Sequence, residues 1–218
     1  MRAGAAGWRI VGSARNRERK NRIEGRQERA LTLTPADVLR AEHDMIRRVI
    51  AILGRESERI GEGTGVDAVF IDRAVDFIYT YAERVHHGKE EEVLFRELDS
   101  KPLSPEHRQM MERLVREHVE MRHLVEDLVE ARDRFAEGDE EALRTIEGVV
   151  GRLSDLYPDH LEMEEGTFFL AAQSYLDDSA EEAILEAMRG HDRAMIHEKH
   201  GALVEDLEAV AETWQLSE

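Results

Sequence analysis

Apolar residues recur at every third or fourth position over four long stretches of the chain. This spacing is typical of helices that bury one face. The stretches begin near residues 34, 66, 105 and 139, and short loops containing Gly or Pro separate them. Long helices joined by short loops run antiparallel to their neighbours and enclose one core. The pattern therefore predicts an all-α protein in which residues 34–176 form an antiparallel up-down four-helix bundle.

The first and fourth of these helices carry clear local signals. Thr34 is placed to cap the first helix, Pro35 suits its first turn, and Asp37 completes a variant of the capping box. In the fourth helix, Pro158 lacks the backbone N–H that an α-helix uses. We expect a kink or a restart of the helix just before His160.

The two ends of the chain differ from the bundle. Residues 1–33 are rich in Arg and have little apolar periodicity, which is typical of a mobile basic tail. A nucleic-acid-binding arm is the alternative interpretation of this tail. In residues 177–218, the cap candidates Asp178 and Ser179 precede a further amphipathic pattern. We expect one C-terminal helix there, packed on the outside of the bundle.

Composition narrows the range of partners. The formal net charge is −18, yet residues 1–30 hold nine basic residues against three acidic ones, which leaves 21 basic and 45 acidic residues for the rest. Such an acidic surface repels nucleic acid and anionic membranes, so we expect neither as a partner of the folded part. The negative electrostatic potential of this surface would also attract metal cations. However, the acidic residues need have no role beyond solubility, which accounts for the charge equally well.

Cysteine and long apolar runs are both missing from the sequence. Without cysteine the chain has no disulfide, no thiolate-bound metal and no thiol catalysis. No apolar run reaches the roughly 18–20 residues that span a bilayer, and Arg9 interrupts any signal-peptide core near the N-terminus. We expect a cytoplasmic protein that is neither exported nor membrane-bound.

Each predicted helix of the bundle also carries polar residues on its apolar stripe. Residues four apart share a helix face, so a His-x-x-x-Glu segment directs an imidazole and a carboxylate the same way. Taken alone, each such residue is typical of a surface pair or of a buried histidine, but the agreement of four helices predicts a shared inward-facing site. The residues are His43 on the first helix, His86 and Glu90 on the second, His118 on the third, and His160 and Glu164 on the fourth.

The same residues form an internal two-fold repeat. Each half reads Glu-His on one helix, then His-x-x-x-Glu and an apolar pair on the next. The paired histidines are 43 residues apart from His43 to His86 and 42 apart from His118 to His160. A repeated hairpin that closes on itself would bring four imidazoles and two carboxylates to one level, which is a ligand set for two metal ions.

The mixture of donors indicates the kind of metal. Imidazole suits iron, zinc and copper, whereas carboxylate suits hard ions, so the set favours iron or manganese. A metal-free interaction bundle is the alternative, and it requires internal hydrogen bonds for all six side chains because unpaired buried charges are costly. Ferritin-like di-iron proteins differ in motif order, since they carry Glu-x-x-His on two helices and lone Glu on the others.

Two ten-residue segments, 86–95 and 160–169, share the pattern His-x-x-x-Glu with a later apolar pair. They resemble the two copies of the HHE cation-binding motif of hemerythrin-like proteins, and Glu42-His43 and Glu117-His118 resemble the histidine positions on that family's first and third helices. Residues 197–204 are also similar to a closing helix of the family. The resemblance covers about residues 34–210 and implies a di-iron centre inside a four-helix bundle.

The resemblance also implies residue roles. Oxygen-carrying hemerythrins have a further His one turn after the third-helix ligand, where this chain has Arg122, and an Asp in the last motif, where this chain has Glu164 or Glu165. This departure leaves four clear histidines, predicts more open coordination and argues against reversible oxygen carriage. The implied centre has two iron ions with an oxo or hydroxo bridge, with manganese or zinc as alternatives, bridged by Glu90 and Glu164 and bound by His43, His86, His118 and His160.

Neighbouring residues remain as alternatives. The pair His87 and Glu91 is a second register for the motif on the second helix, and Glu165 is an alternative to Glu164. His123 is a candidate fifth ligand, although on an ideal helix it points away from the ligand five residues before it. We expect His191, His197 and His200 at the surface, and we expect Tyr79 and Tyr157 to serve packing, with a hydrogen bond to the site as the alternative.

The sequence thus predicts a non-haem di-iron protein of the hemerythrin-like type. It would bind oxygen, nitric oxide or peroxide for sensing, storage or detoxification. A di-iron enzyme with peroxidase-like turnover, or one that reduces nitric oxide or oxygen, is the alternative, and the sequence does not separate binding from turnover. Iron–sulfur repair proteins of the resembling family often carry an added cysteine-bearing segment, which this chain lacks.

Overall fold

The computed structural model describes residues 33–63, 67–192 and 194–215. The chain divides into two units, Met1–Thr34 and Pro35–Glu218, and every described helix belongs to the second. The described part is helical and contains no strand, which confirms the all-α prediction. Within it, no helix combines the length and the hydropathy that a membrane span requires. The predicted basic tail, residues 1–33, lies outside the described residues except for Leu33.

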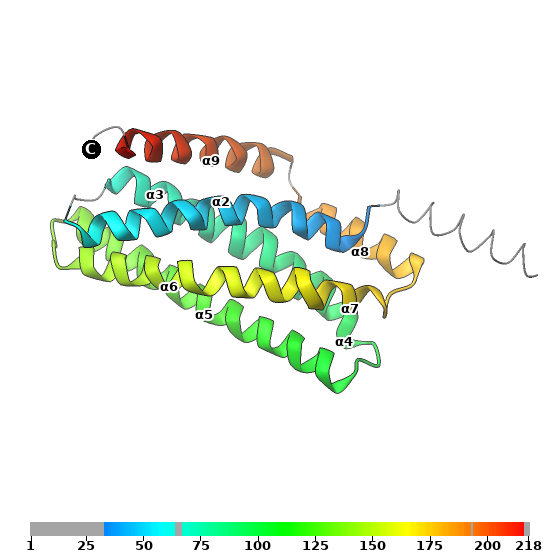
Figure 1. Ribbon diagram of the computed structural model, residues 1–218. Coiled ribbons are helices and arrows are strands. Elements are labelled where there is room, and N and C mark those ends of the chain that lie inside the picture. The colour runs from blue at the N-terminus through cyan, green and yellow to red at the C-terminus, as the bar shows by residue number, and fades with distance from the viewer. Residues whose placement is uncertain (1–32, 64–66, 193, 216–218) are drawn as a thin grey trace, which may run out of the picture. The chain divides into compact units, whose positions relative to one another are not determined.

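Four helical segments follow one another along the chain and lie side by side, with successive segments running in opposite directions (Figure 1). The fourth contacts both the first and the third, and the second contacts the third. They are, in order, α2 (Pro35–Gly61); α3 (Ala68–Phe77), which continues through the π-helices η1 (Ile78–His87) and η2 (Glu90–Phe95) into α4 (Arg96–Asp99); α5 (Pro105–Ala136); and α6 (Ala142–Met163), followed by the π-helix η3 (Glu164–Phe168) and α7 (Phe169–Gln173).

Local sequence accounts for several helix ends. Asp67 accepts two backbone N–H groups at the start of α3, and Ser104 accepts one at the start of α5, just before Pro105. These oxygens satisfy backbone donors that have no partner inside the helix. α6 continues through Pro158 as one helix, so the predicted restart before His160 does not occur.

The apolar interior consists of two clusters with a polar level between them. One cluster includes Ile46, Met121 and Leu161, and the other includes Leu39, Leu114 and Phe168. On α2, for example, His43 falls between a residue of the second cluster and a residue of the first. Each of the other segments also has residues of one cluster before its polar residues and residues of the other cluster after them. Apolar side chains therefore shield the polar level on both sides.

Two helices follow the bundle where the sequence predicts one. They are α8 (Asp178–His191) and α9 (Ala194–Gln215). The backbone leaves the helical conformation at Asp192, which ends α8. α8 contacts α2 and η2, and α9 contacts α2 and α3. His200 on α9, which we expect at the surface, is instead buried beside the rings of Phe77 and Tyr81.

Candidate metal centre

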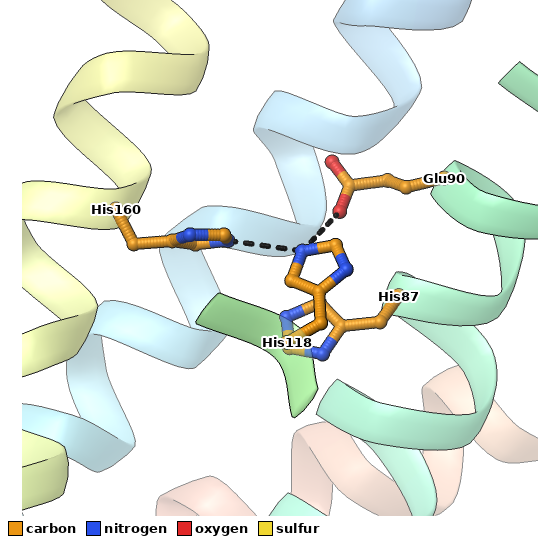
Figure 2. Close-up of side chains that lie close together, drawn as sticks. All are labelled: His87, Glu90, His118 and His160. Atoms are coloured by element: carbon orange, nitrogen blue, oxygen red, sulfur yellow. Dashed lines mark hydrogen bonds and ion pairs between the residues drawn. The ribbon is translucent and has the colours of Figure 1, made fainter. Parts of the chain in front are cut away.

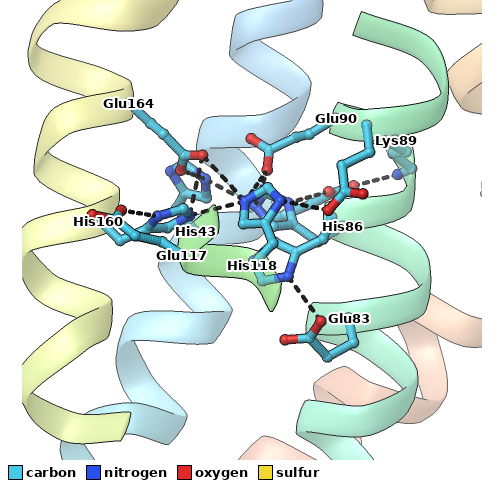
Figure 3. A network of polar contacts seen from close by, with 12 residues as sticks. His43, Glu83, His86, Lys89, Glu90, Glu117, His118, His160 and Glu164 are labelled. Carbon is cyan, nitrogen blue, oxygen red and sulfur yellow. Dashed lines mark hydrogen bonds and ion pairs between the residues drawn. The ribbon is translucent and has the colours of Figure 1, made fainter. Parts of the chain in front are cut away.

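The six residues predicted as ligands from the sequence meet at the polar level of the bundle. All of them are fully buried, and Figure 3 shows them converging from four helical segments. His87, predicted only as an alternative to His86, is fully buried at the same level. The converging residues are His43, His86, His87, Glu90, His118, His160 and Glu164.

These donors form two groups, each compact enough to hold one metal ion. Within a group, one ligand atom from each member lies within 4.8 Å of all the others. Glu90 belongs to both groups, so its carboxylate could contact an ion at either position. One group is His87, Glu90, His118 and His160 (Figure 2), and the other is His43, His86, Glu90 and Glu164. Each group could therefore hold an ion, the first with three imidazoles and one carboxylate and the second with two imidazoles and two carboxylates.

The π-helical backbone of η1 explains why His86 and His87 both face inward. Adjacent residues are about 100° apart around an α-helix. They lie closer together around a π-helix, because each of its turns holds more residues. η1 ends at His87, so both imidazoles leave the backbone within one widened turn. The His-His pair was the signal in the sequence, but a period of about 3.6 residues assigns only one of the two to the core face.

Imidazole nitrogens face one another in pairs at the centre. Nε2 of His43 lies 3.0 Å from Nε2 of His86, and Nε2 of His118 lies 3.2 Å from Nε2 of His160. Two nitrogens that bind the same metal ion, each at roughly 2.1 Å, are separated by about this distance. The nitrogens are therefore spaced as pairs of ligands on one ion.

The outer nitrogen of each of these four histidines donates a hydrogen bond to a glutamate. The pairs are His43 with Glu165 (2.6 Å), His86 with Glu42 (2.9 Å), His118 with Glu91 (2.8 Å) and His160 with Glu117 (2.9 Å). Burial opposes ionisation of these glutamates, but their histidine and cation partners outweigh it and lower each pKa. Ionised carboxylates only accept, so Nδ1 of each histidine carries a proton, and Nε2 points inward, where it offers a lone pair whenever the imidazole is neutral.

A cation holds each of these glutamates from the outside. The contacts are Arg47 with Glu165 (3.0 Å), Arg122 with Glu91 (2.9 Å), Arg113 with Glu117 (2.7 Å) and Lys89 with Glu42. Arg47 and Arg122 follow His43 and His118 by one turn, so the internal repeat extends to them. Lys89 is fully buried and also pairs with Asp192, at the end of α8. Imidazole, carboxylate and cation thus form the same ordered layers at four positions.

The fifth histidine, His87, departs from this pattern. Its Nδ1 lies 3.2 Å from Oε2 of Glu83, but within the described part of the chain neither group completes a hydrogen bond. The nearest cation, Arg122, is 3.9 Å from Glu83. Burial raises the pKa of Glu83 to about 7. The ring of Tyr157 stacks on His87, so this tyrosine lies beside the centre, whereas Tyr79 is 51% exposed.

The two inner glutamates carry the charge that a metal pair would neutralise. Glu164 oxygens lie 3.2 Å from Nε2 of His160 and 3.3 Å from Nε2 of His43. Burial would raise the pKa of Glu164, but the histidines, His160 first, hold it well below its usual value. Burial, followed by Glu164, raises the pKa of Glu90 well above its usual value. In the described structure no oxygen of either side chain completes a hydrogen bond, so the donor set fits metal ions.

The protonation of the histidines also fits metal binding, which requires neutral imidazoles. Burial lowers the pKa of His86 to about 4 and that of His87 well below its usual value. Burial also acts against the charged form of His160, but Glu164 and Glu117 raise the pKa of His160 to about 9. Metal binding at His160 would therefore release a proton.

The remaining sequence candidates lie outside the centre. His123 is a 72% exposed side chain that contacts Glu126, so it is not a fifth ligand. Glu91 and Glu165, the alternative register, bind the outer faces of histidines from the opposite half of the repeat. His191 is partly buried, and the side chain of His197 lies outside the described residues.

A buried set of imidazoles and carboxylates inside a helical bundle is characteristic of a metal-binding helical protein. A family model, the hemerythrin HHE cation-binding domain, matches residues 34–172, and the chain therefore belongs to this family. The match includes every residue of both donor groups and ends before α8. Comparisons with curated proteins and with solved structures gave no match.

Proposed function

We propose that the protein holds two iron ions in the two donor groups and uses them to bind oxygen, nitric oxide or peroxide, for sensing, storage or detoxification. His87, His118 and His160 would hold one ion, and His43 and His86 the other. Glu90 would be shared by the two ions, and Glu164 would belong to the position of His43 and His86. The proposed centre has five histidine ligands, whereas the sequence predicts four.

The paired Nε2 atoms of His43 and His86 carry this proposal. Both histidines use Nδ1 to donate to a glutamate, so both Nε2 atoms bear a lone pair. Two lone pairs 3.0 Å apart repel each other unless a cation lies between them. A metal-free core would need a proton between these two atoms, whereas a metal ion would use both lone pairs.

The number of protein donors at each position supports binding of a small ligand. Each position has four protein donors, with three imidazoles and one carboxylate at one position and two imidazoles and two carboxylates at the other, which would leave coordination positions for an outside ligand. A pair of ferrous ions would supply open coordination positions and electrons for such a ligand. The chain contributes a closed apolar surrounding, since both clusters shield the centre, and outer glutamates that fix the direction of each imidazole.

The test is to load the metal-free protein with ferrous iron under argon and then admit oxygen. We expect two iron ions per chain and a charge-transfer absorption in the near ultraviolet. His118→Ala, which removes a ligand of one position, should lower the iron content to about one ion per chain and abolish the charge-transfer absorption. His123→Ala is the matched control, because it removes an exposed histidine from the same helix.

Two results would count against the proposal. Failure of the wild-type protein to bind iron would remove the centre itself. Binding of two iron ions without any spectral response to oxygen, nitric oxide or peroxide would support the metal site but contradict the proposed binding of these small molecules. Continued consumption of peroxide, rather than stoichiometric uptake, would indicate an enzyme.

A further inference from the structure

The centre is closed, so metal ions need a path into it. Every donor of the two groups is fully buried, and the apolar clusters lie on both sides of their level. An ion that loses its water shell needs replacement oxygen or nitrogen donors along its way. A path for cations should therefore be lined by carboxylates and should reach a ligand of the centre.

A cavity of about 540 Å³ meets both conditions. It lies between η1, η2, α5 and the end of α8. His87 lines it directly, and so do three acidic side chains of increasing exposure: Glu83 is buried, Glu91 is half-buried and Glu92 is exposed. The cavity thus connects the surface to the position with three imidazoles.

Glu83 has the properties expected of a donor that waits for a cation. Its side chain is 7% exposed, and no hydrogen bond to either of its oxygens is found among the described residues. The four glutamates that bind the outer nitrogens of the histidines are each held by a close cation, but Arg122 is 3.9 Å from Glu83. A buried carboxylate without such a partner is costly, and a passing cation would offset that cost.

Charge along the cavity also favours cations. Arg122 donates to Glu91 at 2.9 Å, which neutralises that pair and leaves Glu83 and Glu92 to set the field. The second lining arginine, Arg84, is exposed at the rim. Carboxylates in a narrow, low-dielectric space concentrate cations and raise their rate of entry.

We propose that this cavity is the path by which divalent metal ions enter the centre, and that Glu83 binds each ion transiently and passes it to His87. The inference rests on the proposed metal centre. Among the described residues, three or more donors come within 4.8 Å of one another only in the two groups of the centre. The cavity is therefore a passage and not a second resting site. Its wall includes Gly190 and His191 of α8, beyond the residues that the family model matches.

The first test measures how fast the metal-free, full-length protein takes up cobalt(II), followed by its visible absorption after rapid mixing. Glu83→Gln should slow uptake by roughly tenfold, which is the scale on which charged clefts change entry rates, and should leave the final stoichiometry at two. Glu56→Gln is the matched control, because Glu56 is also a buried glutamate with an oxygen that completes no hydrogen bond within the described chain, but it lies outside the cavity.

The second test blocks the path without touching any donor. Gly190 is part of the cavity wall, and a Cβ built there meets no described atom within 4 Å, so Gly190→Leu should fit without a clash, narrow the mouth of the cavity and slow uptake several-fold. Gly148→Leu is the control: Gly148 is an exposed helical glycine, also with no described atom within 4 Å of its Cβ, and it is not part of the cavity wall.

The outcomes separate this inference from the proposed function. Slower uptake in both Glu83→Gln and Gly190→Leu, with wild-type rates in both controls, supports the path. Wild-type uptake in Gly190→Leu overturns it, even if Glu83→Gln is slow, because Glu83 would then act on His87 alone. Absence of cobalt binding in the wild-type protein would instead reject the metal centre itself.

Discussion

The two hairpins of the bundle carry the same polar pattern in different backbones. In the first hairpin, His86, His87 and Glu90 all lie in or beside π-helical turns, and both histidines reach the centre. In the second, His160 lies in a regular α-helix, and the residue after it, Leu161, packs in the apolar cluster. The repeat is thus nearly symmetric in its carboxylates and asymmetric in its imidazoles.

This difference shows that a small change of backbone decides how many ligands a motif delivers. His87 and Leu161 occupy equivalent places in the two motifs, as do Glu83 and Tyr157 three residues before the paired histidines. The first hairpin fills these places with an imidazole and a carboxylate, while the second fills them with apolar or aromatic groups. The asymmetry of the centre and the cavity beside it both follow from these two positions.

The largest effect is expected from the glutamate that the two donor groups share. Glu90→Gln should reduce binding from two ions to fewer than one per chain, because it removes a charged donor from both positions. Glu164→Gln, the equivalent change in the second hairpin, should preferentially weaken the His43 and His86 position. Metal analysis after gel filtration measures both, and thermal unfolding without metal checks that the variants fold. Equal losses in the two variants would contradict the assignment of Glu90 to both groups.

His87→Leu makes the first motif resemble the second. The position with three imidazoles should lose affinity by roughly 100-fold or more, since even outer partners of metal ligands contribute about 10- to 100-fold. The other ion should remain. Competition with a coloured chelator measures the two affinities separately, and unchanged binding of both ions would show that His87 is not a ligand.

The reverse exchange, Leu161→His, makes the second motif resemble the first. Leu161 is 1% exposed in an α-helical segment, so the new imidazole should enter the apolar cluster rather than the centre. We expect unfolding in urea to show a loss of about 1–3 kcal/mol for a buried polar group without a partner. The number of bound metal ions should stay at two, and a gain in affinity would refute the role given to the π-helical turn.

The smallest effects concern the outermost layer, where the two halves match. Arg47→Ala and Arg122→Ala each remove a partly exposed cation from a glutamate that holds a histidine. Such ion pairs contribute up to about 1 kcal/mol, so each variant should lose less than roughly tenfold in equilibrium metal affinity. The same chelator competition checks this, and a much larger loss in only one variant would break the symmetry of this layer.

Much of the fold was predictable because its signals are periodic and local. The apolar stripes indicated the helices, and the repeat of His43 and His118 indicated the level at which they meet. The π-helical turns were not predictable, since they leave the average spacing nearly intact while they change which neighbours face inward. The sequence alone therefore offers His87 only as an alternative to His86.

The outer layers and the C-terminal region were harder to predict. The local pattern allows Glu91 and Glu165 as replacements for the inner glutamates. Their partners come from the opposite hairpin, and such long-range contacts leave no mark in the local pattern. The sequence pattern also does not indicate the helix break at Asp192, because apolar residues continue at helical spacing on both sides of it.

The number of metal ions bound by the wild-type protein tests the central claim most directly. Titration of the metal-free chain with ferrous iron under argon, followed by metal analysis, should end at two ions per chain. An end point of one ion, or of none, would contradict the dinuclear centre that the paired imidazole nitrogens and the shared Glu90 support.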